Sequence, residues 1–259
     1  MVSGPFMSFF LLIGLIANLV LAGVLGIAKD TSLEPYKLHS YGSVCDFKNE
    51  PSNDQFLNLI QQAYDDMREL TDEVQKNHHK PSAMIGLAIG NQIYFSSSSK
   101  PIIYKLSYPK KGGDGSFNKL PEMPEQFKKV TDALEACSKE ANSDPQHKSN
   151  GMCGELTSTM TWMIDNPDKD ISKENPRVAA WWGDGYLPPC SGDPGSPQWG
   201  CNKWTKEMKF EVIEDTNKKR DRKDTPEPTS TKNVALEKCA KVEQPKGKGK
   251  GGKRDEESS

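Results

Sequence analysis

Apolar side chains are scarce in this chain and unevenly distributed along it. Only 34% of the 259 residues are of the hydrophobic types, and residues 216–259 contain very few of them. Residues 6–28 form the one hydrophobic block long enough to span a bilayer, so a multi-span membrane protein is excluded. The remaining middle, about 170 residues, can form one domain with a core, and this distribution excludes a repeat solenoid and a small disulfide knot.

A large excess of charge of one sign is also missing. The formal net charge is −2, with 13 Lys and Arg against 8 Asp and Glu in residues 216–259, and 21 basic against 28 acidic residues before them. An acidic body with a basic tail argues against a protein that coats duplex nucleic acid. The chain has no Asn-x-Ser/Thr acceptor, which excludes N-glycosylation.

The hydrophobic block predicts a secretory signal peptide with two candidate cleavage sites. Gly26 and Ala28 stand at the minus-three and minus-one positions of a site after Ala28, and Ala22-Gly23 offers a second site. We expect residues 1–28 to be removed and the protein to be secreted, with no stable membrane partner. The alternative is a retained signal anchor that holds the protein at the cell surface.

Residues 52–215 contain the periodic patterns of a folded domain. Ser52 and Gln55 have the spacing of a capping box, and apolar residues at helical spacing follow to about Asn77. Two apolar runs, 83–89 and 92–96, are joined by Gly90-Asn91, which predicts a hairpin covered on both faces.

The rest of this domain alternates helices and strands. Helices are expected over 125–142, from about 151 to 165 and over 201–209, and strands over 177–182 and 210–213. The order predicts an α/β fold, a three-layer sandwich around one mixed β-sheet. Residues 29–51 are interpreted as an extended leader and residues 216–259 as a disordered charged tail.

The six cysteines, which can form three disulfides in an oxidising compartment, also admit a metal site. Cys153-Gly154-Glu155 opens one predicted helix, Pro189-Cys190 follows the buried strand, and Cys201 begins the next helix. A helix N-terminus favours a thiolate, and two such ends facing each other would gather three thiolates around one point. The fourth tetrahedral position would stay open, as in a catalytic zinc site, with Glu155 beside it as general acid and base.

This arrangement resembles the cytidine deaminase-like superfamily, in particular its secreted and toxin-type members. The resemblance covers about residues 52–213 and lies in a helix, a Gly-Asn hairpin, Cys-x-Glu at a helix start, a buried strand and Pro-Cys…Cys. It implies that Cys153, Cys190 and Cys201 hold Zn²⁺ and that Glu155 is the proton shuttle. The implied substrate is cytosine or adenine, as a free base, a nucleoside or single-stranded nucleic acid. Cys190 and Cys201 are separated by ten residues, where the family usually has only a few.

Other residues are weighed beside this site. Tyr186 and Trp199 are candidates to stack on a base, and His147 is either a pocket residue (a substrate contact or spare ligand) or an exposed loop histidine. Because Cys239 lies in the predicted tail, Cys45 and Cys137 are the expected disulfide. The rival function is a secreted, disulfide-stabilised interaction protein or effector without catalysis.

Overall fold

The computed structural model describes the residues that build one α/β unit. The described ranges are 23–32, 39–74, 81–99, 125–141, 147–149, 151, 153–192, 198–215 and 224–235. Most of the predicted signal peptide, much of the predicted tail and Cys239 lie outside them.

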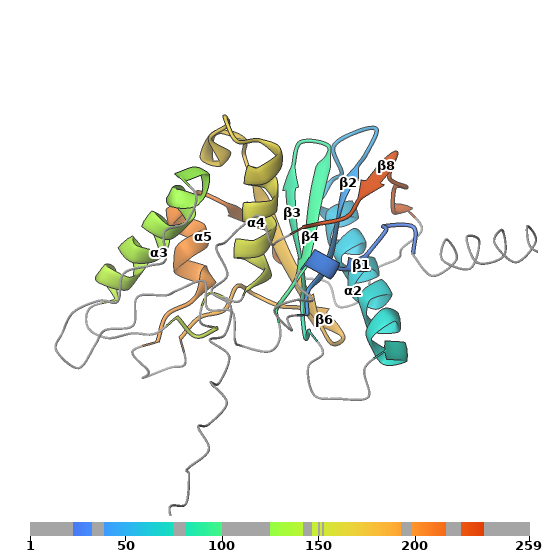
Figure 1. The fold of residues 1–259 in the computed structure, drawn as a ribbon, viewed down its shortest axis with the longest axis horizontal. Helices are drawn as coiled ribbons and strands as arrows, with labels where there is room; N and C mark the ends of the chain where they lie inside the picture. Colours follow the sequence, from blue (N-terminus) through green and yellow to red (C-terminus); the bar gives the residue numbers. More distant parts are fainter. Residues whose placement is uncertain are drawn as a thin grey trace, which may run out of the picture.

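An open mixed sheet forms the middle of the molecule. Its strands run in the order β1-β2-β4-β3-β5-β6, with β8 added beside β2 and β7 beside β5 (Figure 1). All pairings are antiparallel except that of β5 with β7, which is parallel. The strands are β1 (Ala28–Lys29), β2 (Tyr41–Asp46), β3 (Met84–Ile89), β4 (Gln92–Ser97), β5 (Arg177–Trp182), β6 (Gly185–Tyr186), β7 (Glu211–Val212) and β8 (Ser230–Lys232).

Helices cover both faces of this sheet. One face is covered by α2, whereas α3, α4 and α5 lie on the other side of the strands (Figure 1). The helices are α2 (Asn53–Val74), α3 (Lys128–Glu140), α4 (Gly154–Asp165) and α5 (Cys201–Glu207), with short 3₁₀ turns η2 (Glu125–Phe127) and η3 (Ile171–Lys173). The prediction of an α/β fold around a mixed sheet is confirmed.

The central strands are apolar on both sides because each side has its own core. In β3, Ile85 and Leu87 pack into the core on the side of α3, α4 and α5, called the α3–α4–α5 core below. Met84 and Ala88 pack into the core on the side of α2, called the α2 core. Since successive side chains of a strand point to opposite faces, a strand buried on both sides becomes a continuous apolar run. The prediction of a doubly covered hairpin is therefore confirmed.

Local chemistry sets the two clearest boundaries. The Ser52 backbone N–H donates to Gln55 Oε1 (3.0 Å) and the Gln55 N–H donates to Ser52 Oγ (3.2 Å), so the capping box forms and α2 begins beside it. Gly90 has a φ of +56°, which a two-residue type II′ hairpin turn requires at its first position.

The interpretation of residues 29–51 as a leader is wrong for β2. Tyr41–Asp46 is buried over most of its length and pairs with β4 from Gly42↔Ser96 to Asp46↔Gln92. Ser230–Lys232, in the predicted tail, likewise pairs with β2. Gly, Ser and Asp are weak strand formers, so tertiary contacts rather than local preference make β2 a strand.

The predicted disulfide between Cys45 and Cys137 is also wrong. Both thiols are free, and the sheet separates them: Cys45 lies in the α2 core and Cys137 in the α3–α4–α5 core. Burial raises the pKa of Cys45 to about 12 and that of Cys137 to about 11, so both are inert neutral thiols.

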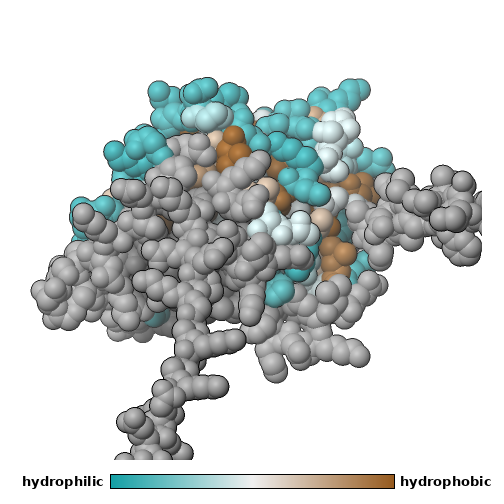
Figure 2. Space-filling view, in the orientation of Figure 1, coloured by the Kyte–Doolittle hydropathy of each residue, from teal (hydrophilic) through white to brown (hydrophobic). Residues whose placement is uncertain are grey.

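The visible surface is mostly hydrophilic where the structure describes it, with hydrophobic residues showing only in small areas (Figure 2). Val24 and Trp182, each 57% exposed, are the exposed large hydrophobic residues of the described ranges. Within those same ranges, no helix has the length and apolar character needed to cross a bilayer.

Candidate metal centre and pocket

The N-terminus of α4 brings Cys153 and Glu155 against the sheet. Cys153 is the N-cap residue, with φ −78° and ψ 144°, and its side chain makes no capping hydrogen bond. Gly154 allows the close approach, because a Cβ there would lie 2.5 Å from the Ser96 carbonyl oxygen and would also collide with Ile85. The glycine between Cys153 and Glu155 is thus a packing requirement of this helix start.

Cys190 and Cys201 lie close together because hydrogen bonds join the two ends of the loop 191–200. The Cys201 backbone N–H donates to the Cys190 sulfur (3.2 Å), and the Asn202 N–H donates to the Cys190 carbonyl (3.1 Å). A side chain on Gly200 would collide with the Cys190 carbonyl, so the two segments are in close contact. The ten-residue spacing therefore does not keep the two sulfurs apart.

His147 reaches the same point through a pairing that its sequence context does not reveal. It forms a parallel β-bridge with Trp199, and the Lys148 N–H donates to the Trp199 carbonyl (2.7 Å). The imidazole packs edge-on against the Trp199 ring, with centroids 4.9 Å apart, and is 1% exposed. The interpretation of His147 as an exposed loop histidine is wrong.

Together, four side chains lie close enough to hold a metal ion. The ligand atoms of His147, Cys153, Cys190 and Cys201 are all within 4.8 Å of one another. The Cys153 and Cys190 sulfurs are 3.5 Å apart, and His147 Nε2 is 3.5 Å from the Cys201 sulfur and 3.9 Å from the Cys190 sulfur. Zinc bonds of about 2.3 Å to sulfur and about 2.0 Å to nitrogen imply roughly 3.8 Å between sulfurs and roughly 3.5 Å from sulfur to nitrogen in a tetrahedron, so the residues fit such an ion.

The hydrogen bonds of the imidazole decide which part His147 can play. Its Nδ1 accepts the backbone N–H groups of Ser149 (3.1 Å) and Gly151 (3.3 Å), which assigns the ring proton of a neutral imidazole to Nε2. That N–H points toward the sulfurs of Cys190 and Cys201. For Nε2 to bind a metal, the proton would have to move to Nδ1 and face two other N–H groups. The pattern favours three sulfur ligands with His147 as a hydrogen-bond donor to two of them.

The thiols of Cys153, Cys190 and Cys201 differ in how readily they ionise. Hydrogen bonding by Cys153, and then by Cys201, holds the pKa of Cys190 well below its usual range. The pKa of Cys153 is raised, first by its hydrogen bond with Cys190, and burial raises the pKa of Cys201. Protein groups alone thus support one thiolate between two neutral thiols. A cation among the sulfurs would let all three ionise.

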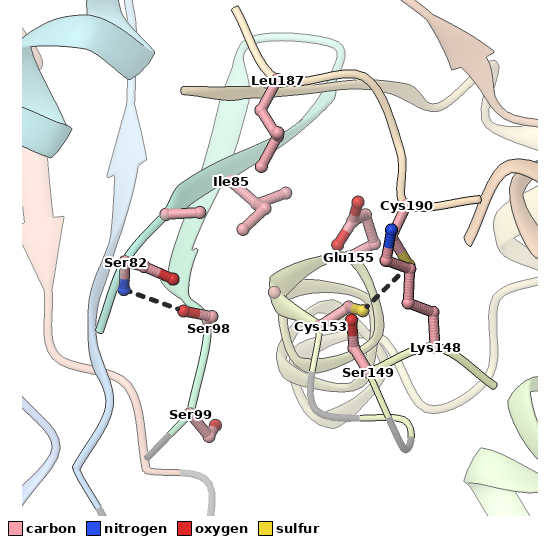
Figure 3. Close-up of a pocket in the computed structure, with 12 residues that line it drawn as sticks. Ser82, Ile85, Ser98, Ser99, Lys148, Ser149, Cys153, Glu155, Leu187 and Cys190 are labelled. Carbon is pink, nitrogen blue, oxygen red and sulfur yellow. Dashed lines mark hydrogen bonds between the residues drawn. The ribbon is translucent and has the colours of Figure 1, made fainter. Parts of the chain in front are cut away.

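Glu155 is the only carboxyl that lines the adjoining pocket within the described ranges. Its side chain is 6% exposed, and burial, followed by the negative charge of Cys190, raises its pKa to about 8. Figure 3 shows Cys153 facing Cys190, with Glu155 beside them at the start of α4. A buried carboxyl that holds a proton near neutral pH can act as an acid and, once deprotonated, as a base.

The pocket has a volume of about 260 Å³, at the small end for binding sites, and suits a small ligand. The apolar side chains of Ile85 and Leu187 line it, and Ser82, Ser98 and Ser99 provide polar groups from the sheet side (Figure 3). The remaining lining residues are Ala83, Lys148, Ser149, Cys153, Gly154, Glu155 and Cys190.

The predicted stacking residues are not part of this lining. Trp199 is 2% exposed and packs on His147, and Tyr186 packs against the α2 core on the other side of the sheet. Both aromatic side chains pack against other protein groups and do not face the pocket. Leu187, next to Tyr186, is the residue that reaches the pocket, and nothing in the sequence distinguishes it.

Comparisons with known proteins find no relative of this chain. No protein-family model, curated protein sequence or solved structure matches the chain.

Proposed function

We propose that this chain is a zinc-dependent deaminase that hydrolyses the exocyclic amine of a nucleobase. The observation that carries the proposal is the position of Glu155, a buried carboxyl on a pocket wall that also includes Cys153 and Cys190. A metal centre that only stabilised the fold would have no use for this carboxyl, since burying an ionisable group costs free energy. A hydrolytic site needs such a group to move protons.

The donor set supports zinc among the metals available to proteins. Thiolate ligands select soft or borderline ions, and a compact cluster of sulfur and nitrogen donors is typical of Zn²⁺. When bound, the ion would supply an activated water molecule beside the pocket. Glu155 would take a proton from that water and deliver protons to a ring nitrogen and to the departing amine. The net reaction replaces the amine with a carbonyl oxygen from water and releases ammonia.

The hydrogen bonds of His147 support an open site. With Nδ1 bound by the backbone N–H groups of Ser149 and Gly151, the imidazole is set to donate to thiolates. Three sulfurs then remain as ligands, which leaves one tetrahedral position for water. His147 would hold Cys190 and Cys201 in their ionised form, as outer-shell hydrogen-bond donors commonly do.

The pocket lining suits a flat heterocycle with a polar edge. Ile85 and Leu187 offer apolar surface for the faces of a ring, and the hydroxyl groups of Ser98 and Ser99 offer partners for its edge. Cytosine and adenine share these properties, and either can be presented as a free base, a nucleoside or part of a single strand.

A second candidate function rests on the closeness of His147 to the sulfurs. If Nε2 binds the ion, the site is closed by four protein ligands, which is typical of a structural zinc centre. The chain would then be a secreted, non-catalytic interaction protein stabilised by a metal rather than by disulfides.

The test is ammonia release by purified, zinc-loaded protein from a panel of bases, nucleosides and single-stranded oligonucleotides. We expect release from a cytosine- or adenine-containing substrate, about one zinc ion per chain, and a loss of at least 100-fold in rate for Glu155→Gln. Zinc content and the unfolding midpoint of this variant should stay unchanged.

Glu211→Gln, at an exposed position of β7, is the matched control and should keep full activity. Activity that survives in Glu155→Gln would remove this carboxyl from the reaction. Zinc bound at one ion per chain with no ammonia from any substrate would favour the closed, non-catalytic centre.

A further inference from the structure

The first described residues of the chain are built into the core. Leu25 and Ile27 are 0% and 1% exposed and pack in the α2 core. Ala28 and Lys29 form β1, which pairs with β2 through Ala28↔Gly42 and Lys29↔Tyr41. Cleavage after Ala28 would therefore remove two core side chains and half of a strand.

Further contacts fix this amino-terminal segment, residues 23–29, back to its first residue. The Cys45 thiol donates to the Leu25 carbonyl (3.3 Å), and the Gly26 N–H donates to the Gly23 carbonyl (2.8 Å). Gly26 takes a φ of +62°, and Thr231 of β8 lies against it, with 2.9 Å between the Thr231 hydroxyl and the place of a Cβ. The segment thus lies along β2 at the edge of the sheet, with Thr231 of β8 against Gly26 (Figure 1).

A carboxylate lies against the beginning of the segment. A Cβ on Gly23 would collide with the side chain of Asp66 in α2, lying 2.5 Å from its Cγ and 2.8 Å from Oδ1. A side chain at this position would have to displace the Asp66 carboxylate. The Gly23 nitrogen, attached to the same Cα, lies in the neighbourhood of this carboxylate.

We propose that the signal peptide is cut between Ala22 and Gly23, and that the α-ammonium group of Gly23 then pairs with Asp66. Ala22 supplies the small side chain that signal peptidases require at the minus-one position, and the aliphatic Val20 stands at minus three. Water hydrolyses the Ala22–Gly23 amide: its oxygen joins the Ala22 carbonyl carbon as a carboxylate, and the Gly23 nitrogen leaves as an amine that is protonated at neutral pH. The whole packed segment stays in the mature chain.

The experiment is expression of the full chain in a secreting eukaryotic host, with the N-terminus of the secreted protein determined by intact mass and terminal sequencing. We expect Gly23 as the first residue. Ala22→Leu and Ala28→Leu place the same large side chain at the two candidate minus-one positions. The first variant should lose the Gly23 terminus, and the second should keep it.

A wild-type terminus at Lys29, or a wild-type chain that retains residues 1–22, would overturn the proposal. This result does not depend on any enzymatic activity. The pairing has its own readout: Asp66→Asn should raise the rate at which the Gly23 α-amine reacts with an acylating reagent several-fold. An unchanged rate would reject the ion pair.

Discussion

The helices on the two faces of the sheet begin in opposite ways. At the start of α2, the polar groups of Ser52 and Gln55 bond to each other's backbone, and Ser52 is exposed. At the start of α4, the Cys153 side chain makes no capping bond, and Glu155 in the first turn is buried. Polar side chains at the first helix start stabilise the helix. At the second, Cys153 belongs to a cluster that could hold a metal ion, and Glu155 lines a pocket.

This contrast extends to the cores on the two sides. The α2 core is filled by large apolar side chains, such as Phe56, Ile60 and Phe95. The α3–α4–α5 core includes Cys153 and Cys201 among its buried residues, next to an open pocket. The α2 side is an apolar core, whereas the other side combines its core with a cluster that could hold a metal ion.

The largest effect should follow loss of a sulfur ligand. Cys201→Ser should abolish metal binding and lower the free energy of unfolding by several kcal/mol, since structural zinc sites contribute on the order of 10 kcal/mol. Metal analysis and thermal unfolding with and without a chelator would measure it. Cys45→Ser, which changes a buried thiol of the α2 core, is the control and should retain the metal. Equal metal content in both variants would break the contrast between the two cores.

Gly154→Ala should have the second-largest effect. The new methyl group would collide with the Ser96 carbonyl and with Ile85, which should cost about 1–3 kcal/mol and move Cys153 and Glu155 off their positions. Activity should therefore fall more than tenfold. Gly185→Ala meets nothing within 4 Å and should be neutral in both thermal unfolding and ammonia release.

Ser52→Ala tests the helix start on the α2 side of the sheet. Loss of the cap should cost about 1 kcal/mol, and lower the unfolding midpoint by about 2–4 °C, because the Gln55 N–H loses the Ser52 hydroxyl as its acceptor. Metal content and catalytic rate should not change. A loss of metal in this variant would show that the two helix starts are not independent.

The smallest effect concerns pH. Hydrogen bonding from Lys129, together with that from Ser172, lowers the pKa of Asp170 to about 2, below the value of about 3.9 in an unfolded chain. The stabilisation is therefore complete above about pH 4 and is lost as the pH falls toward 2. Because both side chains are more than one-third exposed, it should amount to less than 1 kcal/mol. Lys129→Met should remove the larger part of this contribution in acid unfolding experiments, and the part from Ser172 should remain.

Sequence reasoning succeeded where the determining interactions are local. The capping box of Ser52, the positive φ of Gly90 and the strand β5, buried except for Trp182, are each set by a few adjacent residues. Cys153 and Cys201 were placed at helix starts for the same reason.

It failed where distant segments determine the outcome. Tyr41–Asp46 is a strand because β4, β1 and β8 pair with it, and His147 is buried because it forms a bridge with Trp199. These pairings join segments far apart in the chain and leave no periodic pattern. The Cys45–Cys137 disulfide was predicted by elimination, without knowledge that the sheet would separate the two thiols.

The close contact between Cys190 and Gly200 bears on how a pair of cysteines like Cys190 and Cys201 can be recognised in a sequence. Because contacts between Cys190 and the segment from Gly200 to Asn202 hold the two sulfurs, their positions depend on the two ends of the loop rather than on the number of residues between them. Search patterns that demand a fixed interval between the two cysteines would pass over chains of this design. A pattern that allows any interval, but requires glycine directly before the second cysteine, would find them.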